Sequence, residues 1–389
     1  MRVTTKRFLF TIAYGLIVVL FVEVALQLFY FVSAGQPLFT RVGIPIYVPN
    51  EYTKFGVRPN LTLEHDTTEF KTTIYTNSRG FRVSGSREEY TTGRDPSRYR
   101  IMILGPSFAF AWGVDFEDSF AARLEQLLEA GGYAQGRDVE IVNAGIPSSP
   151  PELQLAGYEH EWAEYAPDLV INFIYGSMVI AKEDLDQYSV DARGYLVRSL
   201  TFGRKMQLVL KKSAIVFYSW VIYTRLQSAG AETEPRTAVL GAGRELALQD
   251  SFRPDDPPVV ESLRFYERLR RAVEPTGAEL LILYFPLSYS VHRGDISRWR
   301  HLGVHDVDKQ IAFDDAFCDY LSERGYECLD ITPQLTAQST SGDDRLYYWL
   351  DIHWTPRGNR VAAEAVAEFL LSERASGASG DASPARGGS

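Results

Sequence analysis

The stretch RIMILGPSFAFAWGV, residues 100–114, decides the fold that we expect for this chain. It begins with a short, apolar, β-rich run, which predicts a buried strand. The glycine and proline that follow predict a sharp turn, and this turn presents Ser107 at the approach to a helix. A serine in such a place is most often a helix N-cap, so the turn alone does not make Ser107 a nucleophile.

Four further apolar segments share this strand-like character and alternate with helical segments. We expect strands at 100–105, 138–145, 168–176, 278–286 and 326–331. The helices are expected at 119–132, 152–165, 261–275, 308–325 and 356–374. Near-continuous apolar strands that alternate with helices predict a parallel sheet covered on both faces, which is an α/β domain.

The N-terminus carries a candidate membrane span. Basic residues up to Arg7 precede the apolar run 8–33, in which Glu23 is the only charged residue. Such a run is long enough to cross a ~30 Å hydrocarbon layer as a helix. The positive charge before it predicts a single-pass anchor with a cytoplasmic N-terminus and a periplasmic main domain. A cleaved signal peptide is the alternative, and Glu23 either contacts a membrane partner or reaches water at the outer interface.

The composition limits the function and the compartment. A formal net charge of -10, without a stripe of Lys and Arg, argues against nucleic-acid binding. The spacing of Cys318 and Cys328 suits a disulfide in an oxidising compartment, and two buried free thiols are the alternative. Because there is no third cysteine and no histidine cluster, we expect no metal site and no cofactor.

Changes of pattern along the chain indicate its organisation. Short alternating segments between residues 47 and 90 predict a small antiparallel layer. An aromatic-rich helical stretch interrupts the α/β rhythm at about 200–254; it covers the site as a lid, rests on the membrane surface, or packs in the core. The expected parts are a cytoplasmic N-terminus (1–7), an anchor (8–33), a linker with a β-rich segment (34–98), the α/β domain (99–374) and a disordered tail (375–389).

A second motif lies near the C-terminus in YYWLDIHWTPRGN, residues 347–359. Asp351 and His353 are two positions apart, so in an extended segment both project to the same side, where the carboxylate can orient the imidazole. Thr355 and Pro356 then predict the N-cap and first turn of the last helix. The segment supplies a candidate carboxylate-backed base, unless His353 is only a packed imidazole.

Together with GFR (80–82), IVNAGIPSSPPELQL (141–155) and YAPDLVINFIYG (165–176), these motifs resemble the SGNH (GDSL-like) hydrolases. The resemblance is greatest to a membrane-anchored bacterial branch related to polysaccharide O-acetyltransferases and esterases. It implies a three-layer α/β/α, flavodoxin-like domain and ester chemistry. Carried over to this sequence, it implies that Ser107 is the nucleophile, His353 the general base and Asp351 the acid that orients it.

Three positions depart from the family pattern. Pro106 stands in place of the aspartate before the serine, and Ser148 in place of a glycine in the second motif; Ser177 is in register with the asparagine of the third. The resemblance implies an oxyanion hole built from the N–H groups of Ser107 and Ser148, with the Ser177 hydroxyl as substitute for the amide. Loss of one such donor costs about 10²- to 10³-fold in rate.

The loop after the fourth strand, 286–305, is the candidate substrate loop. Arg298 and Trp299 offer a charged fork and an aromatic face for a sugar or a carboxylated acceptor, although Trp299 could instead pack inward. His292 ranks behind His353 as the base, because only Asp295 lies near it in sequence.

These inferences predict a membrane-anchored extracytoplasmic serine esterase or O-acyltransferase that acts on acyl esters, chiefly acetyl esters, of a glycan. The implied partners are the acylated glycan or another ester substrate, the inner membrane and a membrane-bound O-acyltransferase. The alternative is a catalytically degenerate SGNH-fold protein that binds glycan or assists such an acyltransferase without covalent turnover.

Overall fold

A five-stranded sheet forms the centre of the protein in the computed structural model. The structure describes residues 2–34, 43–67, 69–175, 185–198, 206, 210, 212–219, 222, 257–292, 295, 316–339, 344–349 and 351–380. The sheet has the order β12-β11-β8-β6-β7. Its strands are β6 (Arg98–Leu104), β7 (Asp138–Asn143), β8 (Leu169–Ile174), β11 (Glu279–Tyr284) and β12 (Glu327–Asp330).

All neighbouring strands of this sheet are parallel. Counted in chain order, they follow the arrangement 2-1-3-4-5, which is the flavodoxin-like order. The α/β class expected from the sequence is confirmed. The chain leaves β6 for β7 on one side and then crosses to β8 on the other, so the loop after β6 opens at the switch point where ligands bind in such sheets.

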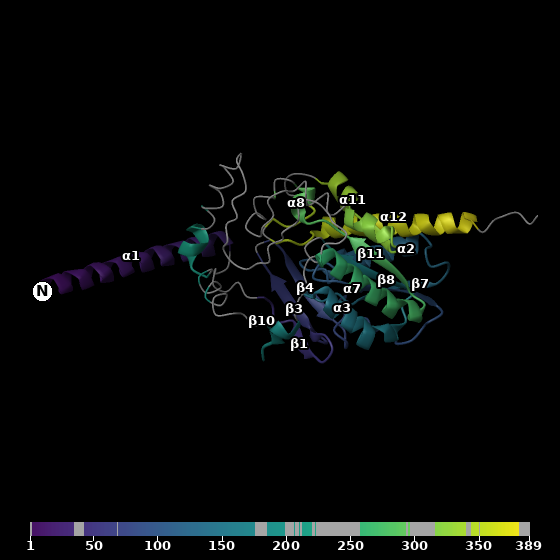
Figure 1. The fold of residues 1–389 in the computed structure, drawn as a ribbon, viewed down its shortest axis with the longest axis horizontal. Coiled ribbons are helices and arrows are strands. Elements are labelled where there is room, and N and C mark those ends of the chain that lie inside the picture. Colours follow the sequence, from purple (N-terminus) through teal and green to yellow (C-terminus); the bar gives the residue numbers. More distant parts are fainter. Residues whose placement is uncertain are drawn as a thin grey trace, which may run out of the picture.

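Side chains of β6 alternate between two apolar cores, as the two-residue period of a strand requires. Ile101 and Ile103 pack with α2 and α12, whereas Met102 and Leu104 pack with α3 and α7. Figure 1 shows these helices around the sheet. Their bounds are α2 (Phe120–Ala130), α3 (Pro151–Gly157), α7 (Pro257–Val273) and α12 (Pro356–Gly380).

The prediction of a single α-helix over 152–165 is wrong beyond Gly157. There the chain changes to a π-helical turn, Tyr158–Trp162, and then to a 3-10 turn, Ala163–Tyr165. The indole of Trp162 lies against Gly157, where a Cβ atom would come within 2.3 Å of the ring. We infer that the wider turn lets Trp162 fold back over this glycine.

The alternating segments before the main sheet form two antiparallel units. β1 (Tyr47–Asn50) pairs with β2 (Lys54–Val57), and β3 (Thr62–Asp66), β4 (Lys71–Thr76) and β5 (Arg82–Val83) form a three-stranded sheet. The buried Arg82 guanidinium donates hydrogen bonds to the carbonyls of Thr73, Tyr75 and Val114. Burial lowers the pKa of Arg82 to about 10. Arg82 thus joins the three-stranded sheet to the segment that follows β6.

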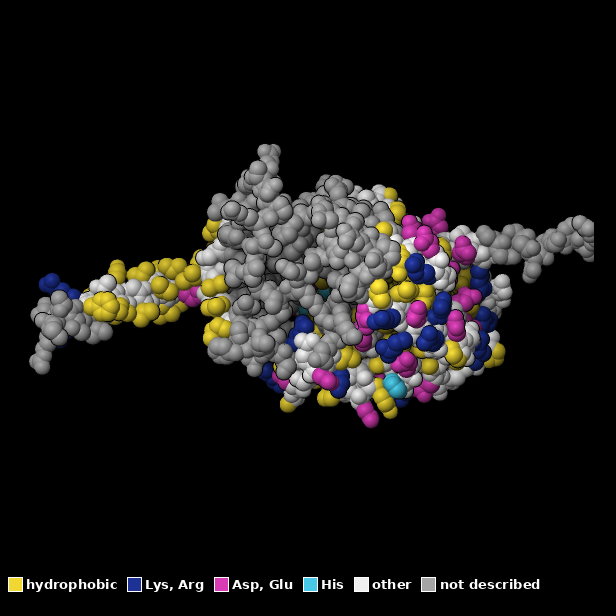
Figure 2. Space-filling model, viewed as in Figure 1, with side chains coloured by type: hydrophobic (Ala, Val, Ile, Leu, Met, Phe, Trp, Pro, Cys, Tyr) yellow, Lys and Arg dark blue, Asp and Glu magenta, His cyan; other side chains and the backbone are white. Residues whose placement is uncertain are grey.

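The first helix, α1 (Arg2–Ala34), projects away from the α/β domain (Figure 1). Its segment Lys6–Val32 is long and apolar enough to cross a membrane. Apolar side chains cover most of its visible surface (Figure 2). By length and composition, this helix has the properties of a single span or of a signal sequence.

The C-terminal part departs from expectation at one boundary. α12 extends to Gly380, past the end expected at residue 374, so it includes the first residues of the expected disordered tail; residues 381–389 lie outside the described part. The two cysteines, Cys318 in the helical segment 316–322 and Cys328 on β12, form a disulfide with a Cα–Cα distance of 5.5 Å. Of the two states that the sequence left open, the structure contains the disulfide.

Candidate active site

Ser107 lies in the turn that follows the carboxyl end of β6. Gly105 begins this turn at a point where a Cβ atom would come within 2.6 Å of the Phe173 Cβ on β8. The carbonyls of Pro106 and Ser107 accept hydrogen bonds from the N–H groups of Phe110 and Trp112, at 3.1 and 3.0 Å. The chain therefore continues in hydrogen-bonded turns, and Pro106 is compatible with them because the proline supplies an acceptor and needs no donor.

The loop 347–354 presents Asp351 and His353 to this turn. Tyr347 and Trp354 form an isolated antiparallel bridge at its base, and the Tyr348 N–H donates to the His353 carbonyl at 3.0 Å. Residues 351–353 form a bend, so the extended conformation expected for this segment is wrong. In the bend, Asp351 Oδ1 accepts a hydrogen bond from the backbone N–H of His353 at 3.0 Å, which an extended pair cannot form.

The three side chains form a continuous hydrogen-bonded chain. Asp351 Oδ1 also contacts His353 Nδ1, and His353 Nε2 lies 2.5 Å from Ser107 Oγ. Burial alone would raise the pKa of Asp351, but the hydrogen bonds and charge of His353 hold this pKa below its usual value. The carboxylate is thus ionised at neutral pH and favours the tautomer that carries a proton on Nδ1. Nε2 is then free to accept the proton of Ser107.

Aromatic side chains fix the position of the imidazole. Phe108, directly after Ser107, lies with its ring centroid 4.8 Å from that of His353 and 5.1 Å from that of Trp354. The indole of Trp112 lies 5.9 Å from the imidazole. Trp354 is almost completely buried. His353 is therefore both packed and hydrogen-bonded to Ser107, and the two interpretations of this residue are not exclusive.

The last helix is capped as the sequence predicts, and this cap holds the loop. Thr355 Oγ1 accepts a hydrogen bond from the Gly358 N–H at 3.2 Å and donates one to the Arg345 carbonyl at 2.7 Å. Gly358 has no space for a side chain, because a Cβ atom would lie 2.1 Å from the Leu346 carbonyl oxygen. The first turn of α12 therefore contacts Arg345 and Leu346, just before the loop 347–354, and so fixes both ends of this loop.

The second motif, after β7, packs directly on the Ser107 turn. The Asn143 amide donates to the Ala109 carbonyl at 2.7 Å, and the Ser149 hydroxyl donates to the Gly105 carbonyl at 3.0 Å. Ser148 adopts a φ of 65° in spite of its side chain. The left-handed conformation that a glycine would provide is thus present, at some cost in backbone strain.

Among the described residues, the backbone N–H groups of Ser107 and Ser148 donate to no protein acceptor. Both remain candidate donors to an oxyanion. The other residues predicted for the site, Ser177, Arg298 and Trp299, lie outside the described residues. The carboxylate of Asp295, which was the only acid near His292 in sequence, is buried and forms an ion pair with Arg345.

Glu69, which no sequence motif indicates, holds the loop that carries Asp351. Its carboxylate accepts hydrogen bonds from the backbone N–H groups of Trp349 at 2.6 Å and Asp351 at 2.7 Å. Glu69 lies between β3 and β4, more than two-thirds of the chain away in sequence. Nothing in the local pattern around Glu69 indicates this contact.

His65 on β3 is a second missed residue beside the site. Its imidazole contacts the rings of Trp112 at 4.8 Å and Phe70 at 5.0 Å. Its Nδ1 atom is buried and has no hydrogen-bond partner among the described residues. Burial lowers the pKa of His65, an effect that the nearby Asp351 carboxylate partly opposes. A neutral imidazole is thus expected next to Trp112.

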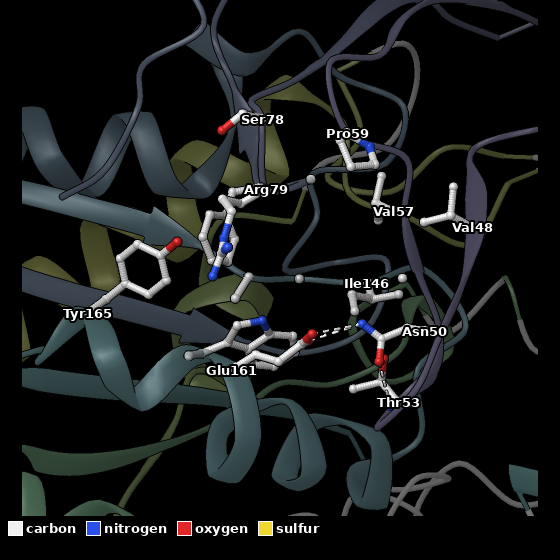
Figure 3. Close-up of a pocket in the computed structure, with 16 residues that line it drawn as sticks. Val48, Asn50, Thr53, Val57, Pro59, Ser78, Arg79, Ile146, Glu161 and Tyr165 are labelled. Atoms are coloured by element: carbon white, nitrogen blue, oxygen red, sulfur yellow. Dashed lines mark hydrogen bonds between the residues drawn. The ribbon is translucent and has the colours of Figure 1, made fainter. Parts of the chain in front are cut away.

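A cavity of about 260 Å³ lies on the other side of the second motif, between β1–β2 and the π-helical turn (Figure 3). Asn50 donates to Glu161 across it at 3.0 Å, and Arg79 forms an ion pair with Glu164 at 2.5 Å. Residues 144–146 contribute to its wall, but no residue of the Ser-His-Asp chain lines it. Within the described part of the chain, no three metal-ligating side chains come together.

Comparison with known proteins finds one matching family. Residues 244–384 match a family model described as SGNH hydrolase-like domain, acetyltransferase AlgX. The matched segment contains Asp351 and His353, whereas Ser107 precedes it. In this segment the chain is similar to the SGNH hydrolases, and its sheet has the flavodoxin-like order. A comparison with curated proteins gives no match.

Solved structures of esterases and lipases resemble the chain weakly. An acetyl xylan esterase, AlAXEase, has 11% identity over 69% of this chain and 98% of its own, with a TM-score of 0.39. A lipase/acylhydrolase from Enterococcus faecalis has 13% identity over 70% and 96%, with a TM-score of 0.37. A GDSL-like lipase from Bacteroides thetaiotaomicron VPI-5482 has 8% identity over 73% and 92%, with a TM-score of 0.34.

Proposed function

We propose that the protein is a membrane-anchored, extracytoplasmic serine esterase or O-acyltransferase that acts on acyl esters, in particular acetyl esters of a glycan. The observation that carries this proposal is the 2.5 Å distance between Ser107 Oγ and His353 Nε2, with Asp351 bound to the other ring nitrogen. The acetyltransferase in the description of the matched family supports the acetyl group. The span-length apolar helix α1 supports the membrane location.

The proposed reaction proceeds in two halves. Ser107 Oγ attacks the acyl carbonyl while His353 Nε2 accepts its proton, and the N–H groups of Ser107 and Ser148 donate to the oxyanion. The tetrahedral intermediate collapses, the leaving alkoxide takes the proton from His353, and the acyl group stays on Ser107. Water or a glycan hydroxyl then attacks the acyl-serine, again with His353 as the base, and restores the free hydroxyl.

A serine-directed fluorophosphonate probe tests whether Ser107 is nucleophilic. We expect the probe to label the wild-type protein and the Ser86→Ala variant, in which an exposed serine is removed, and not to label Ser107→Ala. Hydrolysis of p-nitrophenyl acetate is expected to follow the same pattern. If Ser107 is unlabelled and Ser107→Ala hydrolyses this ester as well as the wild type, the chain is a binding protein on an SGNH fold.

Hydrolysis and transfer are separated by the fate of the acyl group. The protein is incubated with p-nitrophenyl acetate and an unacetylated oligosaccharide, and the products are analysed by mass spectrometry. An acetylated oligosaccharide that requires Ser107 supports an O-acyltransferase. Release of acetate alone supports an esterase.

A further inference from the structure

One face of α1 is covered by another part of the chain. Most side chains of the apolar segment are exposed, but residues 23, 26, 27 and 30 are half-buried. This spacing of three, four and seven positions places the four residues on the same side of a helix. The covering residues are 212–219, which we call the docking segment; positions 214–219 of it are helical.

Hydrogen bonds attach the docking segment to α1. The Glu23 carboxylate accepts bonds from the Ser213 hydroxyl at 2.8 Å and from the N–H groups of Ala214 at 2.7 Å and Ile215 at 3.0 Å. The Gln27 amide donates to the Lys212 carbonyl and to Glu23, both at 2.8 Å. Two adjacent side chains of α1 thus satisfy four polar groups at the start of the docking segment.

Ring contacts continue the interface along the same side of α1. The ring centroids of Phe29 and Tyr218 are 5.9 Å apart, and those of Tyr30 and Phe217 are 5.5 Å apart, nearly perpendicular. Both pairs have the geometry of favourable aromatic contacts. The interface therefore has a polar part at Glu23 and an apolar part towards the end of α1.

The position of Glu23 along α1 makes these bonds important. With Lys6 placed at the inner edge of a ~30 Å hydrocarbon layer, Glu23 lies ~26 Å along the helix at ~1.5 Å per residue, just inside the outer edge. A carboxylate without partners is costly at such a depth, and so are unpaired backbone N–H groups. The contacts between Glu23 and the docking segment remove both costs together.

We propose that Glu23 docks residues 212–219 on α1 at the outer membrane interface, and that this part of the insertion binds the surface of the lipid bilayer. Side chains in and beside the docking segment suit this partner, because Val216 within it and Met206, Leu210 and Ile222 beside it are all apolar and between 38% and 57% exposed. The proposal rests on the membrane location under Proposed function and is independent of the ester chemistry.

The proposal also implies that α1 stays in the mature protein. Cleavage after Ala34 would remove the carboxylate that binds Ser213, Ala214 and Ile215, together with Gln27 and both aromatic partners. The mass of the protein extracted from membranes is therefore expected to include α1. A mature N-terminus after residue 34 would overturn the proposal, whatever the result of fluorophosphonate labelling.

Hydrogen exchange tests the contacts of Glu23. In the full-length protein in lipid nanodiscs, we expect Glu23→Leu to speed amide exchange in residues 213–217 at least tenfold, without change in peptides of β6 and β8. Thr11→Val is the control, because the Thr11 hydroxyl donates to the Arg7 carbonyl of its own helix and to no other acceptor in the described part of the chain. If Glu23→Leu is not produced, Gln27→Leu is expected to give a smaller change in the same peptides. Unchanged exchange in the variant that is obtained would contradict the docking.

Site-specific labelling tests the lipid contact. The two cysteines of the chain are joined in a disulfide, so Val216→Cys introduces a single free thiol for an environment-sensitive fluorophore. Brominated lipids are expected to quench a label at position 216 and to leave a label at Thr92→Cys, an exposed site before β6, unquenched. Equal, water-like behaviour of both labels would refute the contact with the bilayer.

Discussion

The Asp351 carboxylate holds His353 through two hydrogen bonds, one from the imidazole and one from the backbone. The fold therefore sets the tautomer of His353 as well as its position. Asp351→Asn keeps the size of the side chain but removes the charge, and the amide can present a donor to Nδ1. We expect kcat for acetyl ester hydrolysis to fall about 10³- to 10⁴-fold while KM changes little. Steady-state kinetics with p-nitrophenyl acetate measure this, and a fall in kcat of less than tenfold would argue against this role.

Glu69 acts on the site through the backbone of the loop that carries Asp351. In Glu69→Gln, one carboxylate oxygen becomes an NH₂ group that faces an N–H donor, so the loop is expected to shift. Because a displacement of about 1 Å can cost about 10²-fold in rate, we expect kcat to fall 10- to 100-fold with KM nearly unchanged. Glu64→Gln on β3 is the control, since the ion pair that Glu64 forms among the described residues is with the exposed Lys71. Equal kcat values in the two variants would show that Glu69 does not position the loop.

At the scale of single residues, the sequence indicates partners that are close in the chain or belong to a recognisable motif. Asp351 and His353 fall in this group, and the structure adds the bend that joins them. Glu69 and His65 do not, because their contacts with the site depend on how the small β-layer is placed against the main sheet. Ser148 shows a third limit: its φ of 65° follows from packing against the Ser107 turn and not from its own preference.

Helix α2 carries a carboxyl group, that of Glu125, whose ionisation destabilises the folded state. Glu125 accepts a hydrogen bond from the Ile141 N–H of β7 at 2.9 Å, yet burial, with nearby Glu129 and Glu140, raises its pKa to about 7. A raised carboxyl pKa means that the folded state binds this proton more tightly than the unfolded state. The stability that it provides is present below the unfolded pKa and is lost as the pH rises through about 7.

We therefore expect Glu125→Gln to remove this pH dependence. Between about pH 5 and pH 8.5, we expect the unfolding free energy of the wild type to fall by about 2–3 kcal/mol. The unfolding free energy of Glu125→Gln is expected to show no such fall. Urea unfolding at the two pH values measures the difference. Asp138→Asn, at an exposed position on β7, serves as the control and should behave as the wild type does. Parallel pH profiles for all three proteins would contradict the raised pKa.

Periodicity in the sequence is sufficient to predict the strands of the main sheet, but not every helix boundary or long-range contact. The five buried strands are long enough and apolar enough to be recognised, and their order follows from the rules of parallel sheets. The break in the segment 152–165 is not indicated by the sequence, because helical periodicity continues through Gly157 and the packing of the Trp162 indole on this glycine depends on side-chain volume, which periodicity does not report. The docking segment lies in a stretch that the sequence predicts to be helical, with a lid, the membrane surface and the core as alternative positions. Its contact with Glu23 is not indicated, because this contact joins segments that are far apart in the chain.

The disulfide attaches a helical segment to the edge strand of the main sheet and so contributes to the stability of the entire domain. Cys318 and Cys328 join the helical segment 316–322 to β12, the last strand on that side. A disulfide that closes a loop of this size stabilises a protein by about 2–3 kcal/mol in the chain-entropy model. We expect the Cys318→Ala/Cys328→Ala variant to unfold at a correspondingly lower urea concentration. Dithiothreitol should lower the midpoint of the wild type and leave that of the variant unchanged; equal midpoints in oxidised wild type and variant would exclude a stabilising bridge.

The residues that are hydrogen-bonded in the candidate site are far apart in the sequence, which affects the time at which the site can form. Ser107 and its base are 246 positions apart, and Glu69 and Asp351 are 282 positions apart. If the part of the chain next to α1 crosses the membrane first, Ser107 arrives outside long before the imidazole of His353. A partly exported chain then has a serine without its base and cannot cleave an ester. Under the proposed function, ester cleavage is thus expected to begin only when almost the entire polypeptide has crossed, and its onset would report the completion of export.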